Sequence, residues 1–158
     1  QTWGIAYTST FAWETGIGTI TPDWLLHSRP ASKQTRATGD ERDRTGQVNC
    51  DVCDWIAYPE WQSTMSASLS RDNWRVSLTW RYIDEMDVFD ADDFNTDVDA
   101  VNYFDFFGSY SFDHVEVSVG VENFTDEEPP FIPGVSQNSS PYYDYLGRFF
   151  YARLKYSM

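Results

Sequence analysis

Alternation of apolar and polar side chains is the feature that most constrains how this chain can fold. It is strictest in residues 74–82, whose apolar members are Trp74, Val76, Leu78, Trp80 and Tyr82. A β-strand places successive side chains on opposite faces, whereas a helix would scatter both sets around its circumference. Residues 115–122 repeat the pattern with four valines. The sequence therefore predicts strands that are apolar on one face and polar on the other.

Similar patterns predict an all-β chain of about seven strands without a helix. The expected strands cover residues 3–13, 17–26, 61–69, 74–82, 102–112, 115–122 and 145–158. Alternation also reconciles 41% hydrophobic residues with a mean hydropathy of -0.52, because each apolar residue is followed by a polar one. No apolar run approaches the roughly 20 residues of a transmembrane helix, so a helical membrane protein is excluded.

The connections between these strands alternate between short and long. Tight turns are expected at residues 14–16, 70–73 and 112–114, and long segments at residues 28–58, 83–100 and 125–143. In an up-and-down antiparallel sheet, alternate connections lie at the same end. One end then carries tight turns and the other large loops, as in transmembrane β-barrels with short periplasmic turns and long extracellular loops. Tryptophans near the expected strand ends suit the membrane interface, although aromatic residues also fill ordinary cores.

The charge of the chain restricts its partners. With a formal net charge of -14, it lacks the Lys and Arg excess that binding to nucleic acid phosphates requires. Docking to anionic lipid headgroups is disfavoured for the same reason. The acidic charge is compatible with a cationic ligand, with metal ions or with plain solubility.

Three stretches between Cys50 and Met158 resemble the C-terminal part of a TonB-dependent outer-membrane receptor. The first is Tyr58-Pro59-Glu60-Trp61, which leads through a turn into Leu78-Thr79-Trp80-Arg81-Tyr82. The second joins Tyr103-Phe104-Asp105 to Asn123-Phe124-Thr125-Asp126 and Pro129-Pro130. The third is Tyr143-Asp144 followed by Gly147-Arg148 before the last strand. The first 49 residues agree with the family only in architecture, and Met158 stands where the family ends on Phe or Trp.

The resemblance implies a barrel of about 22 strands with a plugged lumen, which takes up a scarce nutrient with energy supplied through TonB. Its place would be the bacterial outer membrane, and its cargo a ferric siderophore, cobalamin or an oligosaccharide. Plug and TonB-binding segment are absent from residues 1–158, which correspond to about a third of such a barrel. We therefore expect an open, curved sheet, or a sheet that pairs with other chains.

Charged residues on the polar faces of the strands are candidates for the barrel lumen. They are Arg75, Arg81, Asp105, Glu116, Glu122, Arg153 and Lys155. We expect basic and acidic members to pair across adjacent strands. The solvent face of a soluble sheet would show the same pairing.

Aromatic residues of the long segments are candidate ligand contacts: Trp55, Tyr58, Phe131, Tyr142 and Tyr143. In an alternative reading, the chain is a secreted β-sandwich that binds carbohydrate through such residues. Its acidic segment, residues 84–99, would then hold calcium. That segment lacks the spacing of an EF-hand, so a solvated acidic loop is the simpler interpretation.

Cys50 and Cys53 are expected to form a disulfide in an oxidising exterior. A redox pair and half of a zinc site are the alternatives. No nucleophile, phosphate-binding or metal motif favours an enzyme, so we expect neither catalysis nor a cofactor.

Overall fold

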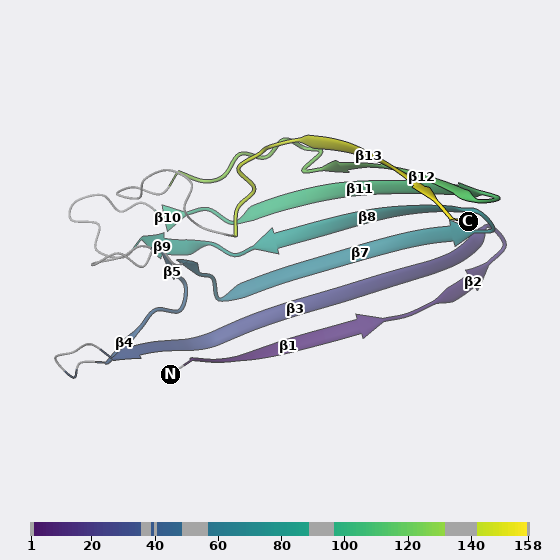
Figure 1. Cartoon of the computed structure of the whole chain (residues 1–158). Coiled ribbons are helices and arrows are strands. Elements are labelled where there is room, and N and C mark those ends of the chain that lie inside the picture. The colour runs from purple at the N-terminus through teal and green to yellow at the C-terminus, as the bar shows by residue number, and fades with distance from the viewer. Residues whose placement is uncertain are drawn as a thin grey trace.

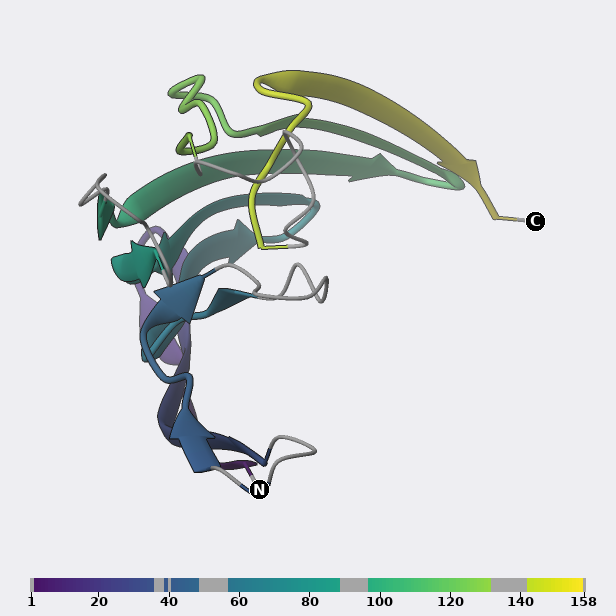
Figure 2. The same cartoon turned by 90° about the vertical axis from the view of Figure 1, so that its left-hand side faces the viewer.

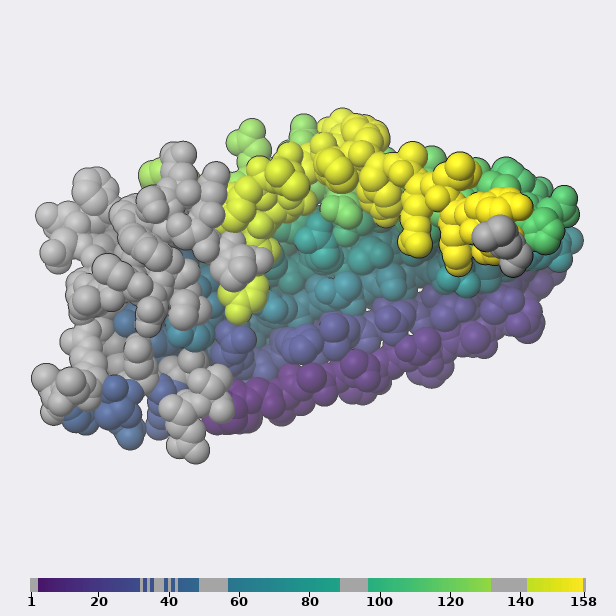
Figure 3. All heavy atoms as spheres, viewed as in Figure 1, coloured from purple at the N-terminus to yellow at the C-terminus, as the bar shows by residue number. Residues whose placement is uncertain are grey.

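The chain folds mainly into one antiparallel sheet. The computed structural model describes residues 2–35, 39, 41–48, 57–88, 97–131 and 142–157. The long strands, in spatial order, are β1 (Thr2–Thr10), β3 (Gly18–Thr35), β7 (Trp61–Arg71), β8 (Trp74–Ile83), β11 (Val101–Phe112), β12 (Val115–Glu122) and β13 (Phe149–Tyr156) (Figure 1). β2 (Trp13–Thr15) continues the path of β1 beside β3. Each long strand therefore pairs with its neighbours in sequence, and the colours of the space-filling view run across the sheet in chain order (Figure 3).

This architecture confirms the expected all-β, antiparallel sheet with strands in chain order. The sheet is curved, with segments of the long connections inside the curve (Figure 2). Within the described residues, neither sheet of the protein closes on itself, as expected for an open, curved sheet. The described residues contain no helix of the length and apolarity needed to cross a membrane.

Three two-residue hairpins close one end of the sheet, which we call the turn end. Thr15 pairs with Gly18, Arg71 with Trp74 and Phe112 with Val115. Two of these turns place an aspartate at positive φ, 50° at Asp72 and 46° at Asp113. Aspartate tolerates this region better than most residues, which is why these sequences can turn so tightly. The described parts of the long connections lie at the opposite end, which we call the loop end (Figure 1).

One face of the sheet is apolar and exposed across all of its long strands. A row across four strands pairs Trp24 with Met65, Met65 with Trp80, and Trp80 with Phe104. Leu78, in the middle of β8, is 47% exposed. Exposed large side chains of this apolar face include Tyr7, Trp13, Trp24, Met65, Leu78, Phe106, Tyr110, Phe112, Val117, Val119, Phe150, Leu154 and Tyr156. The sheet thus presents its apolar side outward instead of burying it.

A second, smaller sheet lies at the loop end. It consists of β10 (Asp97–Val98), β9 (Met86–Val88), β5 (Gln47–Val48) and β6 (Ala57–Tyr58), in that order, with β5 and β9 parallel. β4 (Glu41–Asp43) pairs with the last residues of β3. The buried hydrophobic cluster of the described residues lies here and consists of Val48, Ala57, Ile83, Met86, Val98, Val101, Tyr103 and Tyr143. The long connections therefore fold together into what we call the loop-end core.

Four segments differ from the sequence-based expectation. The strand expected over residues 3–13 is interrupted after Thr10 and resumes as Trp13–Thr15. β3 continues to Thr35 instead of ending near residue 26, because residues beyond Arg29 pair with β1 and β4. The last strand begins at Phe149 and not at Tyr145, since the preceding residues bond elsewhere. The segments expected as loops at residues 28–58 and 83–100 contain the short strands of the second sheet. These strands are too short to show a period.

Candidate functional site

The polar face carries an ion pair where β8 and β11 reach the loop end. Arg81 Nε donates to Asp105 Oδ2 at 2.8 Å, and its NH2 group donates to Asp105 Oδ1 at 3.1 Å. The guanidinium lies over the ring of Tyr103, 4.9 Å from its centroid. Both charges are partly buried, and two parallel hydrogen bonds fix the relative orientation of the two planar groups. This pair joins two adjacent strands in the manner expected from the sequence.

The other candidate charges lie along the same polar face. Glu116 is opposite Lys155 in the β12–β13 register, and Arg153 is opposite Ser118. Arg75 lies between Ser70 and Ser109. Glu122 pairs in register with Phe149. Within the described part of the chain, Arg75, Glu122, Arg153 and Lys155 make no ion pair, so Arg81 and Asp105 are the candidates that the structure brings together.

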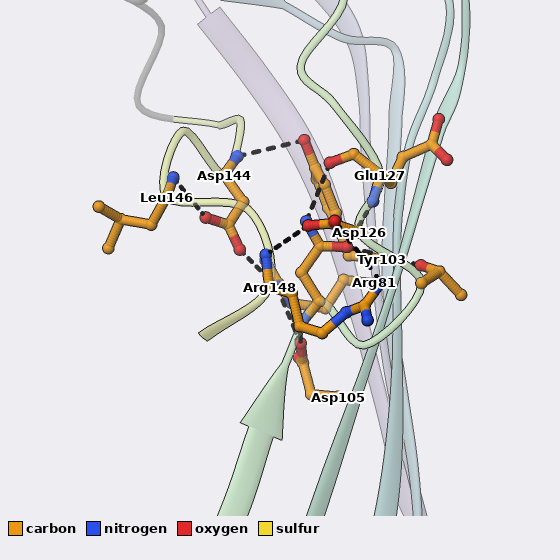
Figure 4. Close-up of polar contacts among 10 residues, drawn as sticks. Arg81, Tyr103, Asp105, Asp126, Glu127, Asp144, Leu146 and Arg148 are labelled. Atoms are coloured by element: carbon orange, nitrogen blue, oxygen red, sulfur yellow. Dashed lines mark hydrogen bonds and ion pairs between the residues drawn. The ribbon is translucent and has the colours of Figure 1, made fainter. Parts of the chain in front are cut away.

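The Arg81–Asp105 pair also holds the final long segment. Asp144 approaches the NH2 group of Arg81 at 3.8 Å, and the backbone N–H of Asp144 donates to the Tyr103 hydroxyl at 3.1 Å (Figure 4). Asp105 Oδ1 additionally accepts the backbone N–H of Asn123 at 2.9 Å. One carboxylate therefore connects β8 to the residue that follows β12.

Asn123 shapes the start of this segment. It is fully buried at 0% exposure, with φ at 49°. Its Nδ2 donates to the carbonyl of Glu127 at 2.9 Å, and its Oδ1 accepts the N–H of Glu127 at 2.9 Å. The side chain thus replaces a backbone partner in a tight turn, which asparagine does readily.

A second contact closes the base of the segment. Asp126 Oδ1 accepts the N–H of Arg148 at 2.8 Å, and Asp126 Oδ2 lies 3.5 Å from the Arg148 guanidinium. Gly147 adopts φ of 65°, which favours glycine, and a Cβ there would lie 3.1 Å from Asp126 Oδ1. We call the whole network the clasp: Arg81, Tyr103, Asp105, Asn123, Asp126, Asp144 and Arg148. It brings the two ends of the segment that joins β12 to β13 together.

Beside the clasp, the polar face is hollowed. The hollow has a volume of about 540 Å³ and is lined by Thr79, Arg81, Asp105, Phe106, Phe107, Glu122, Tyr142, Tyr143, Asp144 and Tyr151. Tyr151 lies over Gly120, where a Cβ would approach the ring Cε1 to 2.5 Å. Glycine at this position is therefore what allows the ring to lie against the sheet.

Tyr143 contributes an unpaired polar group to this region. Its residue is 6% exposed, and its hydroxyl has no hydrogen-bond partner among the described residues. Burial raises the pKa of the Tyr143 hydroxyl well above its ordinary value, so the phenol stays neutral. A buried, neutral hydroxyl can still donate or accept one hydrogen bond.

The remaining candidates are dispersed. Tyr58 lies in β6 beneath Arg29, whose guanidinium carbon is 5.7 Å from the ring centroid, and Phe131 is exposed. Trp55, Cys50 and Cys53 fall outside the described residues, so the disulfide stays a prediction. In the acidic segment, Asp84 accepts a 2.7 Å bond from Tyr82, and residues 89–96 lie outside the described ranges. No group of three metal-ligating residues occurs in the part of the chain that is described.

The sequence named Tyr142 and Tyr143 as candidate ligand contacts, and Arg81 and Asp105 as members of two sets of opposite charge expected to pair. It did not predict that all four line one hollow. It also missed Asn123, Asp126, Asp144 and Arg148 as partners in one network. Their signal was present, because all four belong to the stretches that carry the family resemblance. Comparison of the chain with protein-family models, curated proteins and solved structures found no match.

Proposed function

We propose that this chain forms part of the transmembrane β-barrel of a TonB-dependent receptor in the bacterial outer membrane. The observation that carries the proposal is the apolar face, which is exposed over all seven long strands of the sheet. Soluble monomers rarely expose contiguous apolar patches larger than a few hundred Å². Lipid is the medium that covers such a face on a barrel wall, while the opposite face borders a polar lumen.

The aromatic residues near the loop end fit a membrane interface. Trp24 Nε1 donates to Ser63 and Trp80 Nε1 to Asn102, both at 2.8 Å. In each case the polar atom bonds toward the loop end while the ring stays on the apolar face. Tryptophan is enriched at the headgroup level of membranes because its N–H can bond a polar partner while its ring contacts the apolar layer. The band of lipid contact would then extend from these residues toward the turn end.

Assignment to a receptor, and not merely to a barrel, rests on the clasp. The stretches that resemble the receptor family lie far apart in the sequence, yet they supply the residues that bond one another at the loop end. These residue types occur together because they hold the two ends of the segment between β12 and β13 against the sheet. Receptor function implies energy-coupled uptake of a nutrient, with lipid, a plug domain, further barrel strands and TonB as partners. It does not involve catalysis.

A secreted β-sandwich that binds carbohydrate is the competing proposal, and the aromatic hollow is the observation in its favour. A sandwich buries one face of each sheet against the other, about 10 Å away. In the described residues, the second sheet is made of strands of two or three residues at the loop end, and the apolar face of the large sheet stays exposed. The barrel proposal accounts for this face and the sandwich proposal does not.

Site-directed labelling tests the proposal in the protein that carries this chain, produced in a Gram-negative bacterium. Cys50 and Cys53 are first replaced by serine, and a single cysteine is introduced as Glu85→Cys at the loop end or His114→Cys at the turn end. Both positions are exposed. A membrane-impermeant maleimide should label Glu85→Cys on intact cells and His114→Cys only after the outer membrane is opened. Equal labelling on intact cells, or recovery of the protein without detergent as a soluble monomer, would contradict the proposal.

A further inference from the structure

We infer that the hollow beside the clasp binds a small ligand carrying an ammonium or guanidinium group. The inference deepens the proposed function, because it assumes that this face borders the path of the cargo. It narrows the cargo to cationic molecules and disfavours anionic ones. The charges and the rings that line the hollow, together with its size, carry the inference.

The charges of the lining do not balance. Among the described residues that line the hollow, Asp105, Glu122 and Asp144 are acidic and Arg81 is the single cation. Arg81 is already engaged with Asp105 in two hydrogen bonds and lies near Asp144. Glu122 makes no ion pair with any described residue and is exposed to the hollow. A cation entering here gains a carboxylate partner, whereas an anion meets uncompensated negative charge.

Aromatic rings supply the second component. Phe107, Tyr142, Tyr143 and Tyr151 line the same space. The face of an aromatic ring attracts cations through its quadrupole, and aromatic cages are a known mode of recognition for organic ammonium groups. Next to the hollow, the protein already uses this interaction internally, since Arg81 lies over Tyr103.

The size of the hollow supplies the third component. The volume of about 540 Å³ falls in the range of small-molecule sites.

Three five-carbon probes with different end groups test the inference. They are 1,5-diaminopentane, 1,5-pentanediol and glutarate, which present ammonium, hydroxyl and carboxylate ends on one chain length. Binding is measured by calorimetry and ligand-observed NMR on the detergent-solubilised protein. We expect diaminopentane to bind most tightly and glutarate least. Glutarate binding as tightly as diaminopentane would overturn the inference, and tighter binding of pentanediol would point to a neutral, hydroxyl-rich cargo instead.

Variants separate the hollow from the general acidity of the chain. Glu122→Gln should weaken diaminopentane binding by about fivefold, the upper range for an exposed ion pair, and leave pentanediol unaffected. Glu116→Gln removes a carboxylate from the same face near the turn end and should change neither affinity. Equal losses in both variants would show diffuse attraction and overturn the inference. The labelling pattern of Glu85→Cys and His114→Cys is independent of these affinities, so either proposal can fail alone.

Discussion

The seven long strands of the sheet, which we call the wall, and the loop end are built on opposite principles. In the wall, large apolar side chains face outward and the backbone ladder holds the strands together. At the loop end, apolar side chains from separate connections pack inward around Tyr103, as in a small soluble domain. Two methionines show the difference, since Met65 is 45% exposed on the wall and Met86 is 2% exposed in the loop-end core.

Under the barrel proposal, this contrast means that one chain is folded against two media. The loop-end core gains stability by removing apolar surface from water and depends little on what surrounds the wall. The wall gains nothing from its apolar face until lipid or detergent covers it. Substitutions at matched positions in the two regions should therefore respond differently.

The largest contrast is expected for the two methionines. Met86→Ala should cost about 2–5 kcal/mol of unfolding free energy, because it empties space in a packed core. Met65→Ala should cost less than about 1 kcal/mol, because its side chain already faces the medium. Urea unfolding of the protein in lipid vesicles measures both values. Comparable losses in the two variants would show that the two regions are not distinct.

The next effect concerns charge on the wall. Leu78→Arg should cost about 2–4 kcal/mol in vesicles, the penalty of an arginine at the bilayer midplane of a barrel. The adjacent Ser77→Arg places the same side chain on the polar face and serves as the control, with a much smaller expected loss. The same unfolding assay compares them. A similar penalty in both variants would argue against lipid contact on the apolar face.

The clasp should show an intermediate effect. Asn123→Ala removes two hydrogen bonds to Glu127 and leaves backbone groups of the turn without partners, at a cost of about 1–3 kcal/mol. Asn73→Ala changes an exposed asparagine at the turn end and should have little effect. Amide hydrogen exchange should accelerate around Glu127 in the first variant only. Unchanged exchange there would mean that Asn123 does not hold the segment.

The smallest effect is the pH dependence that Tyr143 contributes in the loop-end core. Burial raises the folded-state pKa of Tyr143 above that of the unfolded chain, so its contribution is complete below about pH 10 and is lost as the pH rises further. Tyr143→Phe should therefore reduce the loss of stability on alkaline titration. Tyr156→Phe removes an exposed hydroxyl on the wall and is the control. If both variants titrate alike, the hydroxyl of Tyr143 has no special role.

The wall could be predicted from sequence because its signal is local and repeated. Strands such as Trp74–Ile83 alternate over enough residues for the period to be visible, and the turns at Asp72 and Asp113 contain residues suited to positive φ. The loop-end core has no such signal. Its strands, such as Gln47–Val48, are too short to alternate, and their contacts join segments far apart in the chain.

The candidate site was predictable only in parts. Composition and alternation placed Arg81 and Asp105 on one face, and Tyr142 and Tyr143 were noted as loop aromatics. Their convergence involves two contacts made by side chains: Asn123 bonds Glu127 in the turn after β12, and the Asp144 N–H bonds the Tyr103 hydroxyl. A turn made by side-chain bonds leaves no periodic trace in a sequence. Resemblance to a family pointed to these residues without explaining them.

The pairing of each long strand with its neighbours in the chain has a consequence for how such a sheet can grow. A hairpin brings both of its own strands and the turn between them, so hairpins can be added or removed without rewiring the rest. Only the strand at the edge needs a new partner. A sheet of this kind can widen by duplication of hairpin units, each new unit copying the division into an apolar side and a polar side. The connections at the loop end are then free to diverge in length and chemistry.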